Sequence, residues 1–305
     1  MYNIPTDQLL AAELQNINFR VSKTKKGFSS GYSLLDQDLM GGFQAGELYC
    51  FGSVVGMGKT MFTLNLVVNQ LQSLASNEVI VFISTGTSRP VLIQKLLAIA
   101  TGIELRKIQG SDLSKDELST LEGHPFIDTL KLNNLIIVEN NKPFFADINV
   151  TMNELIKEGK VPKMLFIDCL QEVQVPDENT DREQAIFTLL KLIKVMAAQV
   201  KVPILFTSKI SKRVFYRKEG QIPKLEDLLH SRYIAKVADY VYMVLRPNYY
   251  EIPEGPDFSG LPEEFHLFCR KNKHLPLDVL VFSAELKKYK ISQELVYISS
   301  KKIIS

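Results

Sequence analysis

The residues with the clearest chemical meaning form a short glycine-rich loop, GMGKT, from Gly56 to Thr60. The loop follows the apolar run ELYCFG and opens the apolar stretch TMFTLNLVVNQLQSLA, so it should connect a strand to a helix. Glycines let backbone N–H groups turn inward around phosphate groups, and a helix N-terminus attracts anions. Lys59 can reach the β and γ phosphate oxygens, and the Thr60 hydroxyl can bind Mg²⁺. The pattern therefore predicts a nucleoside triphosphate site.

The loop departs from the usual phosphate-binding pattern at one position. Ser53 stands where the first glycine is expected, directly after Gly52. The alternative interpretation is a glycine-rich turn that carries a lysine by chance, which the strand and helix on either side disfavour. We predict nucleotide contacts from this segment: Ser53, Gly56, Met57, Gly58, Lys59 and Thr60.

Two later apolar runs end in residues that bear on phosphate chemistry. MLFIDCLQ delivers Asp168 to the carboxyl end of a strand, where open α/β sheets place their ligands. A carboxylate there can hold Mg²⁺ opposite Thr60, although an aspartate after a strand can also be a turn or helix-cap residue. The strand within VIVFISTGTSRP is followed not by a carboxylate but by Thr85, Gly86 and Thr87. None of these residues can take a proton from water near neutral pH.

From Gly31 onward, short apolar runs alternate with helix-length stretches, and these elements must position the loop. The runs are almost continuous Val, Ile, Leu and Phe, which is typical of central parallel strands covered on both faces. EFHLFCRKNK and LDVLVFSAEL stand closer together and predict a C-terminal β-hairpin. We expect an α/β fold with a mostly parallel central sheet flanked by helices.

The two ends of the chain differ from this core. Residues 5–17 carry apolar positions at helical spacing, and a polar linker follows them. We therefore expect an N-terminal helix and linker over residues 1–27, the main domain over 28–283 and a C-terminal tail over 284–305. A helix that cannot pack on its own domain usually docks on a neighbour.

Composition narrows the class of protein. Of 305 residues, 46% are hydrophobic and 23% charged, with no signal peptide and no apolar run of membrane-spanning length, so we expect no membrane contact. A net charge of +2 means that any nucleic-acid binding must come from local clusters. Cys50, Cys169 and Cys269 lie far apart without metal-ligand spacing, which favours buried thiols and a cytoplasmic location.

Several segments, taken in order, resemble the C-terminal RecA-type ATPase domain of the DnaB-like hexameric replicative DNA helicases. They include SGYSLLDQDLMGGFQAGELYCFGSVVGMGKTMFTLNL, KMLFIDCLQEV, VPILFTSKISKRV and DLLHSRYIAKVADYVYMVLRPNYYE, and the resemblance spans roughly residues 28–283. It implies a RecA-type P-loop NTPase core that binds ATP and Mg²⁺, forms a homo-oligomeric ring and acts on single-stranded DNA with other replication proteins. We expect no counterpart of the family's N-terminal collar domain.

The resemblance also marks a missing catalytic group. The family's water-activating glutamate aligns with Gly86, which implies slow hydrolysis with little effect on binding, since general-base help is worth about 10²–10⁴-fold. Glu139, which ends NLIIVEN, and Glu172, which follows Asp168 closely, are carboxylates that could substitute for it. The alternative is that both are ordinary solvated acids.

Two cationic positions of the family are altered as well. Its Lys-x-Arg finger, which crosses to the neighbour's γ-phosphate, aligns with FCRKNKHLP, where Arg270, or Lys271 with Lys273, could serve or could form a solvated basic turn. The sensor position, commonly glutamine, is Lys209, which could contact the γ-phosphate or face solvent. Loss of a trans cation is a second reason to expect weak turnover.

The segment SKISKRVFYRKEGQIPK is the densest basic cluster of the core, and in the family this loop faces the DNA channel. Lysine and arginine there can neutralise phosphates, and Phe215 and Tyr216 can stack on bases, although a charge run can also be plain solvated surface. The DNA-binding candidates are Lys212, Arg213, Arg217 and Lys218. The family's backbone-gripping Arg-Glu-Gly stretch aligns with Leu229, His230 and Arg232, so any DNA grip is not the standard one.

Two functions from different classes remain open at this point. One is a divergent helicase or translocase motor that acts on single-stranded DNA in replication, with weakened ATP hydrolysis. The other is a catalytically inactive nucleotide-binding adaptor that uses ATP as a structural or regulatory ligand. A signalling ATPase of the circadian-clock kind fits the order of segments less well.

Overall fold

The computed structural model describes residues 27–132, 134–175, 181–217, 222–249 and 263–293, together with Leu10 and Leu14. Within these residues the chain forms a nine-stranded sheet with the order β3-β2-β4-β5-β1-β6-β7-β8-β9. The strands are β1 (Leu48–Ser53), β2 (Glu78–Ser84), β3 (Leu135–Glu139), β4 (Val161–Asp168), β5 (Ile204–Lys209), β6 (Tyr240–Leu245), β7 (Glu263–Asn272), β8 (Val279–Glu285) and β9 (Lys290–Ser292). β1 therefore lies centrally, between β5 and β6.

The first six strands run parallel and the last three run antiparallel. β1 pairs in parallel with β5 and β6, β2 with β3 and β4, and β4 with β5. The pairs β6–β7, β7–β8 and β8–β9 are antiparallel. Every residue of β1 and β6 is buried, as expected for strands covered on both faces. The predicted α/β fold is confirmed, and β9 is a further strand that the sequence did not predict.

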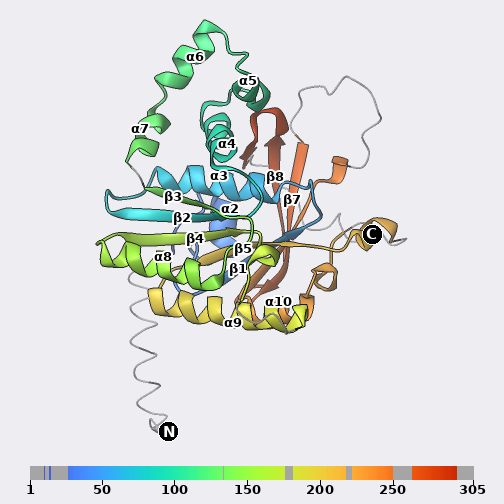
Figure 1. Ribbon diagram of the computed structural model, residues 1–305. Helices are drawn as coiled ribbons and strands as arrows, with labels where there is room; N and C mark the ends of the chain where they lie inside the picture. Colours follow the sequence, from blue (N-terminus) through green and yellow to red (C-terminus); the bar gives the residue numbers. More distant parts are fainter. Residues whose placement is uncertain are drawn as a thin grey trace.

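Helices cover both faces of the sheet (Figure 1). α3 and α4 lie on one side and α8, α9 and α10 on the other, while α5, α6 and α7 extend away from the sheet. The helices are α2 (Ser33–Asp38), α3 (Lys59–Leu71), α4 (Arg89–Thr101), α5 (Leu105–Gly110), α6 (Lys115–Glu122), α7 (Pro125–Lys131), α8 (Phe145–Lys157), α9 (Arg182–Val200) and α10 (Ser231–Val237). Each parallel crossover thus carries the chain back over a face of the sheet.

A group of aromatic rings fixes α3 against the sheet. Phe62 is fully buried, and its ring stacks between Tyr32 and Phe265, with centroid distances of 5.7 and 5.4 Å. Phe51 of β1 and Phe282 of β8 complete the cluster at 5.3 and 5.6 Å from Phe62. Aromatic pairs contribute about 0.5–1.5 kcal/mol each beyond their area burial. Because α3 begins directly after the glycine-rich loop, this packing also fixes the position of that loop.

The sheet continues past residue 283, where the sequence placed the end of the main domain. That boundary falls inside β8, and β9 is fastened by buried side chains from earlier elements. The Tyr32 hydroxyl donates to the Ile291 carbonyl at 2.9 Å, and Asn65 of α3 bonds both Tyr289 and Ile291 at 2.9 Å. The lysine-rich pattern hid this short edge strand, because only Ile291 of its three residues is buried. Residues 284–293 therefore belong to the domain.

The N-terminal helix predicted over residues 5–17 lies outside the described residues except for Leu10 and Leu14. Both leucines are helical, and their side chains are 59% and 51% exposed. The part of the tail from residue 294 onward also lies outside the described residues. Across the described ranges, no helix has the length and apolar character needed to cross a bilayer.

Candidate nucleotide site

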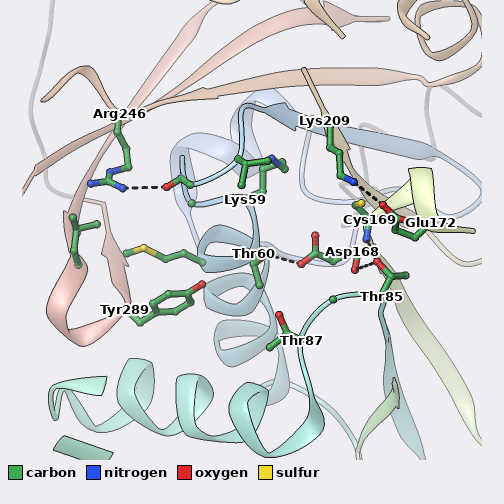
Figure 2. A pocket seen from close by; sticks show the side chains of 16 residues that line it. Lys59, Thr60, Thr85, Thr87, Asp168, Cys169, Glu172, Lys209, Arg246 and Tyr289 are labelled. Atoms are coloured by element: carbon green, nitrogen blue, oxygen red, sulfur yellow. Dashed lines mark hydrogen bonds and ion pairs between the residues drawn. The ribbon is translucent and has the colours of Figure 1, made fainter. Parts of the chain in front are cut away.

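The parallel strands β1, β2, β4 and β5 deliver their carboxyl ends to one cavity of about 570 Å³ (Figure 2). The cavity lies at the start of α3, and its lining comes from the glycine-rich loop, from the residues after β2 and β4, and from the end of β5. This is the edge of the sheet at which open α/β folds bind ligands. The sequence-predicted residues Lys59, Thr60, Asp168 and Lys209 all line it.

The glycine-rich loop needs glycine at two positions. Gly56 and Gly58 have φ angles of 91° and 95°, in the left-handed region that other residues rarely adopt. At Gly56 a Cβ atom would also lie 2.4 Å from the Tyr249 hydroxyl, so the Tyr249 side chain would have to move to admit one. Gly58 is the N-cap of α3, and the first turn of that 13-residue helix carries no acidic residue. The loop thus leaves N–H groups and a helix N-terminus available to an anion.

Lys59 is held over the loop by oxygen atoms. Its Nζ donates to the Ser53 carbonyl at 2.8 Å, to the Ser53 hydroxyl at 2.9 Å and to the Val54 carbonyl at 3.2 Å. Burial lowers the pKa of Lys59 to about 8, so a phosphate that replaced these neutral oxygens would favour its charged form. Ser53, which departs from the usual glycine, is fully buried and supplies two of the three oxygens. The departure is therefore compatible with a functional loop.

Asp168 lies beside Thr60 in the cavity, and a hydrogen bond joins the two side chains (Figure 2). The Thr60 hydroxyl donates to Asp168 Oδ2 at 2.6 Å, and the Thr207 hydroxyl donates to Asp168 Oδ1. One carboxylate and one hydroxyl are the hard oxygen ligands that Mg²⁺ takes beside substrate phosphates. No cluster of three or more metal-ligating His, Cys, Asp or Glu side chains occurs among the described residues. The donor set thus fits Mg²⁺ bound together with a nucleotide.

The segment after β2 carries no carboxylate. The Thr85 hydroxyl donates to the Asp168 carbonyl at 2.9 Å and accepts the Cys169 N–H at 2.8 Å, so it serves to join β2 to β4. Gly86 lines the cavity, and a Cβ atom added to it would meet nothing within 4 Å. The position that aligns with the family's glutamate therefore borders open space in the cavity that Asp168 also lines.

The structure separates the two carboxylates considered as substitutes. Glu172 belongs to a short 3₁₀ turn, Leu170–Glu172, and it lines the cavity. Its Oε1 accepts a hydrogen bond from Lys209 Nζ at 2.6 Å. Glu139 ends β3, accepts the Arg89 N–H at 2.8 Å, and is not among the described residues that line the cavity. Of these two carboxylates, Glu172 is the one placed toward the nucleotide site.

The basic residues at the end of β7 lie far from this cavity in the same chain. β7 is antiparallel to β6, and Asn272 pairs with Tyr240, so these residues stand at the edge of the sheet opposite the cavity. Each has partners within the chain. Arg270 Nε donates to the Pro223 carbonyl at 2.7 Å. Lys271 Nζ donates to the Ala235 carbonyl at 2.8 Å and to the Ala238 carbonyl, and Lys273 Nζ forms ion pairs with Glu47 and Asp239. A finger that acts on a neighbour would have to leave these contacts.

The basic segment after β5 is only partly described. Lys212 and Arg213 begin a 3₁₀ turn, Lys212–Tyr216, and both are exposed, as is the Tyr216 side chain at 86%. Arg217 instead turns back to pair with Asp227. Lys218 lies outside the described residues. The segment thus presents two exposed cations and one aromatic ring, whereas Arg217 is engaged within the chain.

The stretch aligned with the family's backbone grip is also engaged within the chain. Arg232 Nη2 pairs with Glu183 Oε2 at 2.9 Å, and its guanidinium lies over the Tyr233 ring. His230 has a φ angle of 63° and precedes α10, and Leu229 is 39% exposed. None of these contacts involves the cavity.

The sequence did not single out the far wall of the cavity. Arg246 follows β6, pairs with Glu263 at 2.8 Å and donates to the Gly56 carbonyl at 3.3 Å. Leu286 and Tyr289 come from the segment between β8 and β9, and Lys95 of α4 lies 5.0 Å above the Tyr289 ring. An aromatic and aliphatic wall of this kind suits the flat face of a nucleobase. Arg246 directly follows an apolar strand, and this position could have marked it as a site residue. Tyr289 lay within the predicted C-terminal tail and was therefore not considered.

The fold and the cavity together define a P-loop nucleotide-binding domain of the RecA type. Comparison with known families agrees: the DnaB-like helicase C-terminal domain matches residues 27–293. The chain belongs to this family, and the predicted resemblance is confirmed.

Individual relatives support the same assignment. The chain is 28% identical over 292 residues to a probable replicative DNA helicase of Trieres chinensis, covering 92% of this chain and 61% of that protein. A solved structure of a separate ATPase domain superposes with a TM-score of 0.82 at 20% identity, over 96% of this chain and all of that one. A DnaB-like replicative helicase, studied for its interactions with primase, superposes with a TM-score of 0.81 at 20% identity, over 95% of this chain and 67% of that one.

Proposed function

We propose that this protein is the ATP-binding motor domain of a replicative DNA helicase in which ATP hydrolysis is slow. ATP binds with Mg²⁺: the loop N–H groups from Ser53 to Gly58 and the Lys59 ammonium hold the phosphates, while Thr60 and Asp168 hold the metal. The observation that carries the proposal is the convergence of Lys59, Thr60 and Asp168 at the N-terminus of α3.

Slow hydrolysis follows from two features of the same molecule. Gly86 supplies no general base, and such help is typically worth about 10²–10⁴-fold. A cation supplied by a neighbour is worth about 10³–10⁵-fold, and Arg270, Lys271 and Lys273 are bound within their own chain. Neither feature touches the groups that hold the phosphates, so binding remains strong while turnover is weak.

Single-stranded DNA is the partner that best fits the exposed 3₁₀ turn after β5. Lys212 and Arg213 neutralise backbone phosphates, and the exposed Tyr216 ring offers a stacking surface. In this proposal Arg217 and Lys218 join them, and Arg217 must first leave Asp227. The turn Lys212–Tyr216 follows β5, which ends at Lys209 in the cavity, so DNA and nucleotide would contact adjacent parts of the polypeptide.

The proposed assembly is a homo-oligomeric ring with replication partners, in the cytoplasm. The predicted N-terminal helix docks on an adjacent subunit, and the exposed Leu10 and Leu14 side chains supply apolar surface for that contact. A relative of the same fold was studied for its interactions with primase, and a replication protein of that kind is the partner we propose.

The second candidate function is an adaptor in which bound ATP sets assembly and no motor cycle follows. The open position at Gly86 is the observation that favours it. The two functions differ in whether hydrolysis of the bound ATP is coupled to unwinding of duplex DNA.

One experiment separates the two functions. ATP affinity, steady-state hydrolysis with and without single-stranded DNA, and unwinding of a forked duplex are measured for the wild type, for Lys59→Ala and for Lys160→Ala. Lys160 lies at the opposite edge of the sheet and is the matched control. We expect ATP binding that Lys59→Ala abolishes and Lys160→Ala leaves intact, with slow unwinding that also requires Lys59. ATP binding without any unwinding selects the adaptor, and absence of ATP binding overturns both functions.

A further inference from the structure

An ion pair lines the same cavity as Gly86. Glu172 and Lys209 are joined at 2.6 Å, and both line the same cavity as Gly86 and Asp168. We propose that Glu172 accepts the proton of the water that attacks the γ-phosphate, and that Lys209 positions it. This inference rests on the proposed function, because it assigns a residue to the slow turnover of that site.

The backbone around Glu172 is held firmly enough to place a carboxylate. The 3₁₀ turn Leu170–Glu172 follows two residues after Asp168, so the chain turns directly back to the cavity. Gln171 is 7% exposed, and its side chain donates to the Ser208 hydroxyl at 2.7 Å and accepts the Lys209 N–H at 3.3 Å. Leu170 is fully buried. These contacts fix the turn to the end of β5 and leave the Glu172 side chain at the rim.

Lys209 is suited to release Glu172 when ATP binds. The hydrogen bond to Glu172 raises the pKa of Lys209, so its ammonium stays charged. The side chains are 39% and 34% exposed, and ion pairs of this kind contribute little to stability, so separating them is easy. The γ-phosphate brings more negative charge into the cavity than one carboxylate does. Lys209 then turns to the phosphate and leaves Glu172 as an unpaired acceptor.

The space for the water lies next to Gly86. Apart from Gly86 itself and its two neighbours in the chain, no atom lies within 4 Å of the position of a Cβ at this residue, so the start of a side chain here would enter open space. Gly86, Asp168 and Glu172 line one cavity together with Lys59 and Thr60, so a water bound in this space would share that cavity with the γ-phosphate.

The chemical step is ordinary hydrolysis. The water oxygen forms a bond to the γ-phosphorus, and the bond between that phosphorus and the β,γ-bridging oxygen breaks, with its electron pair staying on ADP. One proton of the water passes to the Glu172 carboxylate and from there to bulk water. The products are ADP and inorganic phosphate, and no further reactant is needed.

The test compares two carboxylates at the ends of neighbouring segments. Single-turnover hydrolysis of radiolabelled ATP and ATP affinity are measured for the full chain, for Glu172→Gln and for Glu139→Gln as matched control. We expect Glu172→Gln to lower the rate by about 10²-fold or more with ATP affinity within about twofold, and Glu139→Gln to change neither. Glu172→Asp, which keeps the carboxylate on a shorter arm, should recover part of the rate.

A rescue variant guards against a purely structural effect. Gly86→Glu added to Glu172→Gln should restore hydrolysis, because it returns a carboxylate to the same water. Equal rates for wild type and Glu172→Gln overturn the inference, as does a wild type that binds ATP without turning it over. In both cases the measured ATP affinity shows that the proposed nucleotide site survives. Failure of ATP binding would instead overturn the proposed function itself.

Discussion

The two halves of the nucleotide cavity differ in how completely their side chains are held. On the phosphate side, Lys59 makes three hydrogen bonds to the loop, and Asp168 accepts hydroxyl groups on both of its oxygens. On the water side, Gly86 borders open space, and Glu172, which lines the same cavity, is paired with Lys209. One half is organised before ligand arrives, whereas the other half must rearrange. In the proposed function, phosphate binding and activation of the attacking water therefore rest on separate residues.

The difference has a structural origin. The phosphate side is built on β1 and α3, which the aromatic cluster around Phe62 anchors to the sheet. The water side is built on residues that follow β2, where Thr85 joins the strands but projects no acid. A single residue after β2 can therefore change turnover without disturbing the fold.

The largest expected effect comes from restoring the missing carboxylate. Gly86→Glu should raise kcat with little change in ATP affinity, because a second carboxylate, not paired with Lys209, would reach the attacking water. The gain adds to that of Glu172 and stays below the about 10²–10⁴-fold that general-base help is worth in full. The site tolerates the change: the backbone of Gly86 is outside the left-handed region, and no atom would collide with its Cβ. Steady-state hydrolysis with and without single-stranded DNA measures the effect. An unchanged kcat in a folded variant that still binds ATP would show that the missing carboxylate does not limit the rate of hydrolysis.

A smaller effect is expected at the opposite edge of the sheet. Lys271→Met removes a charged donor to the carbonyls of Ala235 and Ala238 at the end of α10. Hydrogen bonds from charged groups contribute about 1.5–3 kcal/mol, so the free energy of unfolding should fall by about that amount. Denaturant unfolding measures this loss, and kcat should change less than about twofold. Loss of hydrolysis with unaltered stability would instead identify Lys271 as a cation that acts on the neighbouring subunit.

The smallest effect is expected in the basic segment after β5. Each phosphate contact on a single strand contributes about 0.7 to the slope of log affinity against log salt. Replacing both Lys212 and Arg213 by alanine should therefore reduce that slope by about 1.4 for single-stranded DNA. Fluorescence anisotropy across a salt series measures it. The matched control replaces Arg106 and Lys115, which are exposed on α5 and α6. An equal reduction of the slope in the control would show that Lys212 and Arg213 do not contact the DNA.

The sequence predicted the elements whose signal is local. The glycine-rich loop, the strand that ends on Asp168 and the near-continuous apolar strands follow from residue types and spacing alone. β9 was missed because a three-residue edge strand with one buried residue has no periodicity to detect. Tyr289 was missed with it, although it lines the cavity.

Other features depend on contacts between distant residues. Glu139 and Glu172 look alike in the sequence, and only the path of the 3₁₀ turn after β4 brings Glu172 to the cavity. Arg217 and Lys271 look like available cations, yet Asp227 and the end of α10 hold them. Partners separated by ten or more positions in the chain leave no local signal in a single sequence.

The attachment of β9 to α3 has a consequence for synthesis on the ribosome. The phosphate loop emerges early, because it ends at Thr60, whereas the wall formed by Tyr289 emerges more than two hundred residues later. Asn65 cannot make its bonds to Tyr289 and Ile291 until that segment has left the ribosome. A nascent chain that stops short of Tyr289 would carry a phosphate loop without the opposite wall. The complete wall of the cavity therefore forms only after translation has passed Tyr289.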